Sequence, residues 1–421
     1  MNAGANSPAV ERLMKSQVGN WVSGDDFWGR DHELRELRLQ LDAGNHVLLV
    51  APRRVGKTSL MRELARRLPD NYLCLFVDLE GSQNAADAIA ELALATRQHQ
   101  PLWKRAQSVF QGFLENVDSL QAFELSIKLR DAVASGWRAK GVQLLQSLST
   151  HDGPVIIFLD ELPILVNRML KGDDYKITPE RRRDADLFLS FLREETSRRK
   201  GQIRFVAAGS IGLEPVLRQA ALSATMNTFT PFELSPWDTD TAVEFLTRIA
   251  ESQKLILQRG TAQTMVALLG SAVPHHVQLF FDFASQDARR RKSGELTDGD
   301  VQRVFEERML SSRGHVQLSH LEERLKLVLG PEKQSLAIDL LTDASINGAL
   351  TNERAFAITR DFMSSGEMEG RPEDFLREIL GIFEHDGYLE SKGDGYVFVS
   401  NLVRRWWRAK FNFLAKSGAP Q

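Results

Sequence analysis

The chain has 421 residues, which is enough for two or three domains with sizeable cores. Its net charge of −3 excludes a strong overall attraction to nucleic acid or to anionic membranes. Cys74 is the single cysteine, so an intramolecular disulfide is excluded and a reducing compartment is favoured. The first twenty residues lack the apolar segment of a signal peptide, and no stretch has the apolar length of a membrane span. We therefore expect a cytoplasmic protein with no membrane partner.

Near-continuous apolar runs predict five buried strands, at residues 46–51, 72–80, 154–162, 203–210 and 227–234. Helical segments separate most of them, including 59–68, where Leu60, Leu64 and Leu68 share one face. Such strands alternating with helices predict an α/β fold with a parallel sheet that is covered on both faces. Residues 82–150 are too long for one crossover and predict an insertion of several helices, and residues 237–329 also favour helices.

The loop after the first strand, "APRRVGKTSL" at residues 51–60, is close to the phosphate-binding pattern G-x-x-x-x-G-K-[ST]. Ala51 replaces the first glycine, which alanine can do wherever φ is not positive. In a strand–loop–helix unit, Lys57 would contact the β- and γ-phosphates and Thr58 would bind Mg²⁺. The alternative is an ordinary turn that carries the same residues. The predicted nucleotide-binding residues of the loop are Pro52, Arg53, Arg54, Val55, Gly56, Lys57, Thr58 and Ser59.

A second motif, "VIIFLDE" at residues 155–161, is typical of a Walker B strand. Asp160 would bind Mg²⁺ through water, and Glu161 would orient or deprotonate the attacking water. The alternative is a buried strand that ends in two solvated acids. Together the two motifs predict a catalytic set of Lys57, Asp160 and Glu161, with Thr58 and Asp160 as the metal site.

The segment "FWGRDHELRELRLQL" at residues 27–41, placed ahead of "PRRVGKTSL", resembles the AAA+ superfamily. More narrowly, it is similar to the STAND and archaeal-type ATPases related to Orc/Cdc6, over about residues 26–290. The resemblance implies that Phe27, Gly29 and Arg30 lie near the adenine, although the same residues would also suit an ordinary helix start. It further implies that Ser210 is a catalytic sensor 1 residue, for which a strand-end helix cap is the alternative.

The same resemblance places Pro274, in "GSAVPHHVQLF" at residues 270–280, where other AAA+ proteins have a sensor 2 arginine. No motif identifies an arginine finger, and the candidates are Arg218, Arg198 and Arg199. The only sequence similar to a guanine-selective element is "SKGD" at residues 391–394, outside the nucleotide domain. We therefore expect ATP with Mg²⁺ as the cofactors.

The C-terminal part predicts three helices, at residues 332–346, 351–363 and 371–386, and then a hairpin around residues 393–395. A last helix covers 403–410, and the whole resembles a winged helix. The third helix would read DNA, but it carries five acids, Glu373, Asp374, Glu378, Glu384 and Asp386, against Arg377, with Arg371 at its very start. From residue 331 onward there are 14 acids and 11 bases. This charge disfavours a duplex, which needs cations facing its phosphates.

These features predict four parts: an N-terminal extension (1–25), an ATPase core (26–235), a helical lid (236–329) and a winged-helix-like domain (330–421). Residues 329–334, "LGPEKQ", are the expected linker. The function that we predict is a slow ATPase acting as a STAND-type switch, with a protein partner or self-association as its output. The alternative is an Orc/Cdc6-like DNA-binding ATPase in replication, transposition or transcription control. A third reading is a nucleotide-binding scaffold with negligible turnover, against which Glu161 argues.

Overall fold

A computed structural model of the protein describes residues 16–110, 122–311, 318–365 and 370–417. Its centre is a five-stranded parallel sheet in the order β2-β3-β4-β1-β5, so the predicted α/β fold is confirmed. The strands are β1 (His46–Val50), β2 (Leu73–Asp78), β3 (Val155–Asp160), β4 (Ile203–Ala208) and β5 (Phe229–Glu233). Because all five are parallel, the residues that follow β1, β3 and β4 meet at one edge of the sheet.

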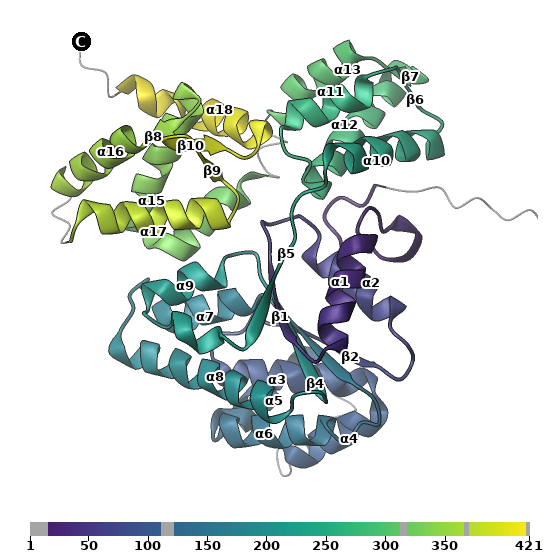
Figure 1. The fold of residues 1–421 in the computed structure, drawn as a ribbon, viewed down its shortest axis with the longest axis vertical. Coiled ribbons are helices and arrows are strands. Elements are labelled where there is room, and N and C mark those ends of the chain that lie inside the picture. The colour runs from purple at the N-terminus through teal and green to yellow at the C-terminus, as the bar shows by residue number, and fades with distance from the viewer. Residues whose placement is uncertain (1–15, 111–121, 312–317, 366–369, 418–421) are drawn as a thin grey trace, which may run out of the picture.

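Helices cover both faces of this sheet (Figure 1). On one face, α1 (Asp31–Asp42) and α2 (Lys57–Arg67) pack against alternate residues of the strands, such as Val47, Phe158 and Val206. On the other face, α7 (Leu162–Lys171), α8 (Pro179–Arg198) and α9 (Leu213–Gln219) bury the intervening residues, such as Ile157 and Phe205. The central strands β3 and β4 are buried on both sides, which explains their unbroken apolar sequences.

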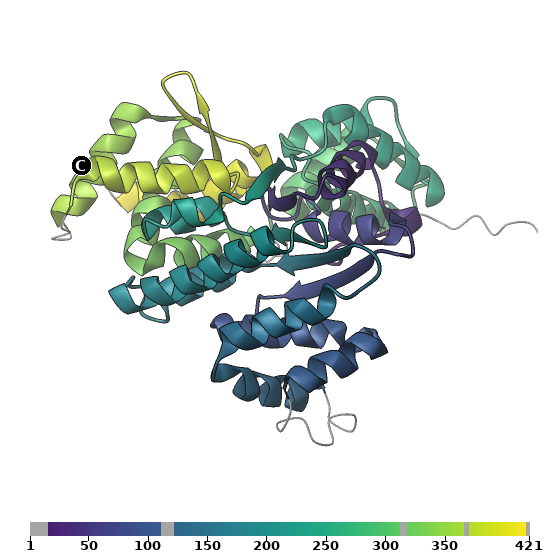
Figure 2. The same ribbon diagram turned by 60° about the horizontal axis from the view of Figure 1, so that its bottom comes forward.

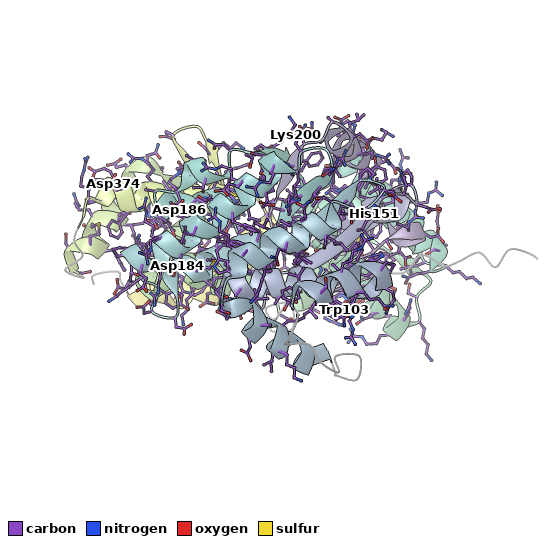
Figure 3. The ribbon with its side chains drawn as sticks, turned by 90° about the horizontal axis from the view of Figure 1, so that it is seen from below. Trp103, His151, Asp184, Asp186, Lys200 and Asp374 are labelled. Atoms are coloured by element: carbon purple, nitrogen blue, oxygen red, sulfur yellow. The ribbon has the colours of Figure 1, made fainter. Side chains whose placement is uncertain are left out.

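The segment predicted as a helical insertion does form helices: α3 (Ala85–Ala95), the short η2 (Thr96–Gln98), α4 (Gln100–Val109), α5 (Ala122–Ala134) and α6 (Trp137–Leu148). Figures 1 and 2 show them grouped at the end of the molecule that is remote from the C-terminal helices. Trp137 packs edge-on against Phe188 and Phe191 of α8. Trp103, labelled in α4 in Figure 3, is 2% exposed. Both tryptophans therefore serve the packing of this group.

A helical region follows β5. It contains α10 (Thr239–Ser252), α11 (Thr261–Leu269), α12 (Pro274–Arg291), α13 (Asp298–Val304) and η5 (Phe305–Met309), whereas the short η4 (Ser223–Met226) lies before β5. Two short parallel strands, β6 (Ile256–Leu257) and β7 (Glu295–Leu296), join its loops. An isolated bridge between Trp237 and Ala272 ties the start of the region to the loop before α12.

The C-terminal module begins within α15 (His320–Asn347). The predicted linker 329–334 coincides with a break in the helical conformation of α15. It is a sharp kink inside this helix, where Gly330 has φ 79° and Pro331 provides no N–H. The module continues with β8 (Leu350–Thr351), α16 (Asn352–Ser365), α17 (Pro372–His385), β9 (Leu389–Lys392), β10 (Gly395–Phe398) and α18 (Asn401–Ser417).

The predicted hairpin is present as β9 and β10, and β8 completes an antiparallel sheet in the order β8-β10-β9. Trp406 and Trp407 of α18 are fully buried, and Trp407 Nε1 donates to Thr342 Oγ1 of α15 at 3.2 Å. The order of elements is the one that the sequence predicted, and the name winged helix stays a prediction. Among the described residues, no helix combines the length and apolarity needed to cross a membrane.

Candidate functional site

The loop between β1 and α2 has the geometry of an anion-binding turn. Gly56 has φ 105°, a left-handed conformation that favours glycine, and it directly precedes the first residue of α2. Ala51 is buried and is not among the described residues with positive φ, so the missing first glycine leaves the backbone unstrained. Arg54 also has a left-handed φ, 67°. The loop therefore curls around the N-terminus of α2, where backbone N–H groups favour a phosphate.

Lys57 lies inside this curl. Its Nζ donates to the carbonyl oxygens of Ala51 at 2.8 Å and of Pro52 at 2.9 Å. Burial lowers the pKa of Lys57 to about 8, although the carboxylates of Glu161 and Asp160 act to raise it. The ammonium is thus held at the loop by backbone acceptors and faces two acids from β3.

The end of β3 supplies those acids. Thr58 Oγ1 donates to Asp160 Oδ2 at 2.9 Å. Burial and the neighbouring Glu161 raise the pKa of Asp160, while the Thr58 hydrogen bond opposes the rise. Two adjacent oxygen ligands suit Mg²⁺, which takes one or two protein ligands and completes its shell with phosphate and water. Among the described residues there is no group of three or more His, Cys, Asp or Glu that could hold a metal ion, as a dedicated all-protein site would require.

Glu161 and Ser210 meet although they are 49 positions apart. Glu161 Oε2 accepts from both the backbone N and the Oγ of Ser210, each at 2.8 Å. Glu161 itself has φ 59°, a rare conformation for a non-glycine residue that turns its side chain out of the strand direction. The predicted sensor 1 serine is therefore the partner that orients the predicted water-activating carboxylate.

A cavity of about 300 Å³ extends from these residues, and aromatic side chains form part of its wall. The Trp237 ring lies 5.1 Å from that of Phe245, and Trp28 lies 6.3 Å from Phe245 in an edge-on arrangement. Trp237 Nε1 is buried and has no hydrogen-bond partner. Flat apolar walls suit a purine base. None of these three residues was predicted, although Trp28 directly follows Phe27 in the motif.

The residues predicted to lie near the base have different positions. Phe27 lines the cavity. Arg30 also lines it, but its guanidinium is buried and bonded to Glu33 at 2.6 Å and to the carbonyl of Ser235 at 2.6 Å. Gly29 stands behind the wall, where a Cβ atom would lie 2.5 Å from Thr241 Cγ2 and 3.3 Å from Trp237 Nε1. Because Gly29 has no side chain, the backbone of the segment 27–30 can pack closely against Trp237.

The described part of the predicted N-terminal extension belongs to the cavity. Trp21 and Val22 line it, and η1 (Gly24–Asp26) follows them. Val22 N donates to Ser59 Oγ at 3.1 Å, and Gly24 N donates to Glu63 Oε2 at 2.7 Å. This segment therefore lies along α2 and closes one side of the cavity, a role that its sequence did not indicate.

The helical region after β5, predicted as a lid, contributes the N-terminus of α12. Pro274 and His275 line the cavity, and Arg54 Nη1 lies 2.6 Å from His275 Nε2. Because a guanidinium can only donate, His275 Nε2 must accept and its ring is neutral in this contact. Burial and Arg53 lower the pKa of Arg54 to about 10, and burial lowers the pKa of His276 to about 3.

None of the three arginine finger candidates is among the residues that line the cavity. Arg199 is buried and bonded to Glu195 at 2.7 Å, and Arg198 pairs with the same acid. Arg218 pairs with Glu214 on α9 at 2.6 Å. Within this chain, these three arginines have structural partners away from the phosphate end.

Residues 26–200 match the family described as AAA ATPase domain. The whole fold is similar to the Walker-type ATPase PABY2304 of Pyrococcus abyssi, with a TM-score of 0.61 and 18% identity over 94% of this chain and 99% of that one. It is also similar to the Aeropyrum pernix ORC2 protein in its ADPNP–ADP complexes, with a TM-score of 0.54 and 13% identity over 94% and 97% of the two chains. No curated protein matches the sequence. Residues 26–200 therefore form a domain of the AAA ATPase family with a phosphate-binding loop, and the fold of the whole chain is similar to that of ORC2.

Proposed function

We propose that the protein is a slow, Mg²⁺-dependent, STAND-type ATPase switch, in which the nucleotide controls how the C-terminal module docks on the ATPase core. The observation that carries this proposal is a corner of the module, residues 385–388, which is seated beside the phosphate end of the cavity. Figure 1 shows the helix that leads into this corner, α17, next to α9 of the core.

The corner contacts both the phosphate-binding loop and the loop after β4. Gly212 N, two residues beyond Ser210, donates to Asp386 Oδ1 at 3.1 Å. A Cβ atom on Gly387 would lie 2.9 Å from Pro52 Cγ, so the module backbone touches the loop directly. The Asp386 carboxylate also acts on Lys57, whose pKa it raises against the effect of burial. A γ-phosphate bound at Lys57 would bring negative charge towards Asp386, and this repulsion favours release of the corner.

The kink of α15 is held by the helices that begin at the catalytic residues. Because Pro331 has no N–H, the carbonyl of Leu327 lacks its helical partner, and it accepts from Asn167 Nδ2 of α7 at 2.9 Å. The next carbonyl, that of Val328, accepts from Lys171 Nζ of α7 and from Gln219 Nε2 of α9. Helix α7 starts directly after Glu161, and α9 starts three residues after Ser210. A displacement of Glu161 or Ser210 would therefore be transmitted through α7 or α9 to the kink of α15, which is the hinge of the module.

The proposed chemistry uses residues that the structure brings together. Lys57 and the loop amides bind the phosphates, and Thr58 with Asp160 would hold Mg²⁺, which neutralises phosphate charge when it is bound. Glu161, oriented by Ser210, accepts a proton from the attacking water or positions it. The aromatic wall of Trp28, Trp237 and Phe245 would take the adenine.

The module has an acidic surface that fits a protein partner or self-association better than it fits DNA. Glu373 and Asp374 are exposed at the start of α17, the helix expected to read DNA in a winged helix. Glu378, further along the same helix, accepts from Gln219 of the core at 2.9 Å and pairs with Lys333 at 2.6 Å. This helix would repel phosphates at one end, and its middle is engaged with the core.

The test is to titrate Mg-ATP and Mg-ADP into the full-length Glu161→Gln variant and to measure affinity, mass by light scattering and shape by small-angle X-ray scattering. We expect both nucleotides to bind and only ATP to change the shape or mass. The Lys57→Ala variant is the control and should show no response. Duplex DNA is then added at two salt concentrations. An unchanged shape in ATP, together with salt-dependent DNA binding, would refute the switch and favour the DNA-binding alternative.

A further inference from the structure

Arg324 in the first half of α15 has an unusual environment. Its side chain is only 12% exposed, yet its one ion pair among the described residues is with Glu80 at 3.8 Å, beyond hydrogen-bond distance. Glu80 itself is 59% exposed on the loop after β2. A guanidinium carries five N–H donors, so the long contact with Glu80 leaves Arg324 with donors for a further acceptor.

Contacts on both sides fix Arg324 close to the phosphate end of the cavity. Tyr388 OH donates to the carbonyl of Leu321 at 2.7 Å, one helical turn before Arg324. The adjacent Gly387 lies against Pro52, the neighbour of Arg53, and Arg53 lines the cavity. The corner of the module thus bridges the phosphate-binding loop and the turn of α15 that carries Arg324.

Arg324 adds a third cation to this region. Burial and then the charge of Arg324 lower the pKa of Arg53, and Arg324 also acts to lower the pKa of Lys57. Two neighbouring guanidiniums are a natural site for an anion, because a phosphate placed between them makes a charge-assisted contact with each. AAA+ ATPases need such positive charge at the γ-phosphate, and here neither a sensor 2 arginine nor one of the finger candidates provides it.

We propose that Arg324 is a phosphate-binding residue of this ATPase: when ATP is bound, its guanidinium leaves Glu80 and binds the γ-phosphate together with Arg53. ADP lacks this phosphate, so Arg324 stays with Glu80 in the ADP state. Because Arg324 belongs to the same helix as the kink at Gly330, its movement towards the phosphate draws α15 with it. The inference rests on the proposed nucleotide site and assigns to it the residue that distinguishes ATP from ADP.

The test compares Mg-ATP and Mg-ADP affinities, measured by calorimetry in the full-length chain with Glu161→Gln present to prevent turnover. For Arg324→Gln we expect ATP to bind about 10- to 100-fold more weakly, which is the loss of one charge-assisted contact, and ADP affinity to stay within about 2-fold. Arg324→Lys keeps the charge without the bidentate geometry and should give an intermediate loss for ATP. Glu80→Gln removes the competing acid and should strengthen ATP binding alone.

The matched control is Lys326→Gln, which removes one positive charge from an exposed position of the same helix. It should leave both affinities unchanged. Equal weakening of ATP and ADP by Arg324→Gln would assign Arg324 a structural role and overturn the inference, and so would no change for either nucleotide. If the parent Glu161→Gln chain binds neither nucleotide, the proposed function fails as well, so the two failures are distinguishable.

Discussion

Replacing Gly212 by alanine should separate the C-terminal module from the core without disturbing the nucleotide cavity. Gly212 has φ −71° and ψ 126°, which alanine adopts without strain, so the effect is purely steric. The added Cβ would lie 2.4 Å from His385 Nδ1 and 2.6 Å from its Cε1, about 1 Å closer than ordinary contact. The imidazole cannot simply rotate away, because its Nδ1 is already engaged with Asp386 at 3.2 Å.

The size of the effect follows from two terms. Overpacking of this kind costs about 1–3 kcal/mol. Displacing the corner also weakens the hydrogen bond from Gly212 N to the Asp386 carboxylate, and such bonds to charged groups contribute about 1.5–3 kcal/mol. A combined loss of about 2 kcal/mol or more raises the undocked population roughly 30-fold. With Mg-ADP, the variant should therefore resemble the ATP state of the unmodified chain.

Hydrogen exchange of residues 382–388 and small-angle scattering would measure this undocking. Gly294→Ala is the matched control, because a Cβ atom there meets nothing within 4 Å. The double variant Gly212→Ala with His385→Ala should dock again, since removing the imidazole makes room for the new methyl group. If Gly212→Ala keeps the exchange and shape of the unmodified chain in both nucleotides, the corner at residues 385–388 does not hold the module and the proposed coupling is wrong.

Three further predictions concern the core. Lys57→Ala should abolish nucleotide binding, whereas Glu161→Gln should retain it and lose turnover, as phosphate release would show; normal turnover in the glutamine variant would remove Glu161 as the base. Burial lowers the pKa of Lys171 to about 8 from 10.5, so the unfolded chain binds more protons above pH 8 and stability should rise with pH. In denaturant titrations between pH 7.5 and 9, Lys171→Met should lose about 1 kcal/mol of this gain in stability, and an unchanged slope would mean that the pKa of Lys171 is not lowered and that the side chain stays charged in this range. Burial raises the pKa of Cys74 to about 12 from 9, so its alkylation at pH 8 should be about 1,000-fold slower than in the unfolded chain, and rapid labelling would contradict its burial.

The sheet and the phosphate end of the cavity could be predicted because their signals are local. A buried parallel strand is an apolar run, and the motifs that follow β1, β3 and β4 are carried by adjacent residues. The parallel topology then forces the ends of those strands to meet. Glu161 and Ser210 come together in this way, although neither sequence segment by itself predicts that these two residues form a hydrogen bond.

The base end of the cavity and the hinge could not be predicted, because their residues are joined only by tertiary packing. Trp237 and Phe245 belong to the helical region after β5. Phe245 lies in the amphipathic helix α10 and Trp237 lies just before it, so their sequence positions indicate ordinary packing residues. The predicted linker at 329–334 carried a Gly-Pro pair, which usually ends a helix. The helical conformation is interrupted there, at Gly330; what the sequence could not show is that Asn167, 160 positions away, donates to the carbonyl that the proline leaves unpaired.

The tie between catalysis and the hinge depends on how closely α7 and the loop after β4 are packed. A Cβ atom on Gly209 would lie 2.5 Å from both Cγ and Cδ of Pro163, in the first turn of α7, so the strand end before Ser210 cannot move without this helix. In the proposed switch, a displacement of Ser210 by a bound γ-phosphate would be shared by α7 and α9, the two helices that hold the carbonyls of the kink. Reversing a docking equilibrium from 99:1 to 1:99 needs about 5.5 kcal/mol of differential binding. Two or three charge-assisted contacts made only with the γ-phosphate supply an energy of this order, which is why the number of cations at that phosphate decides whether the chain can act as a switch.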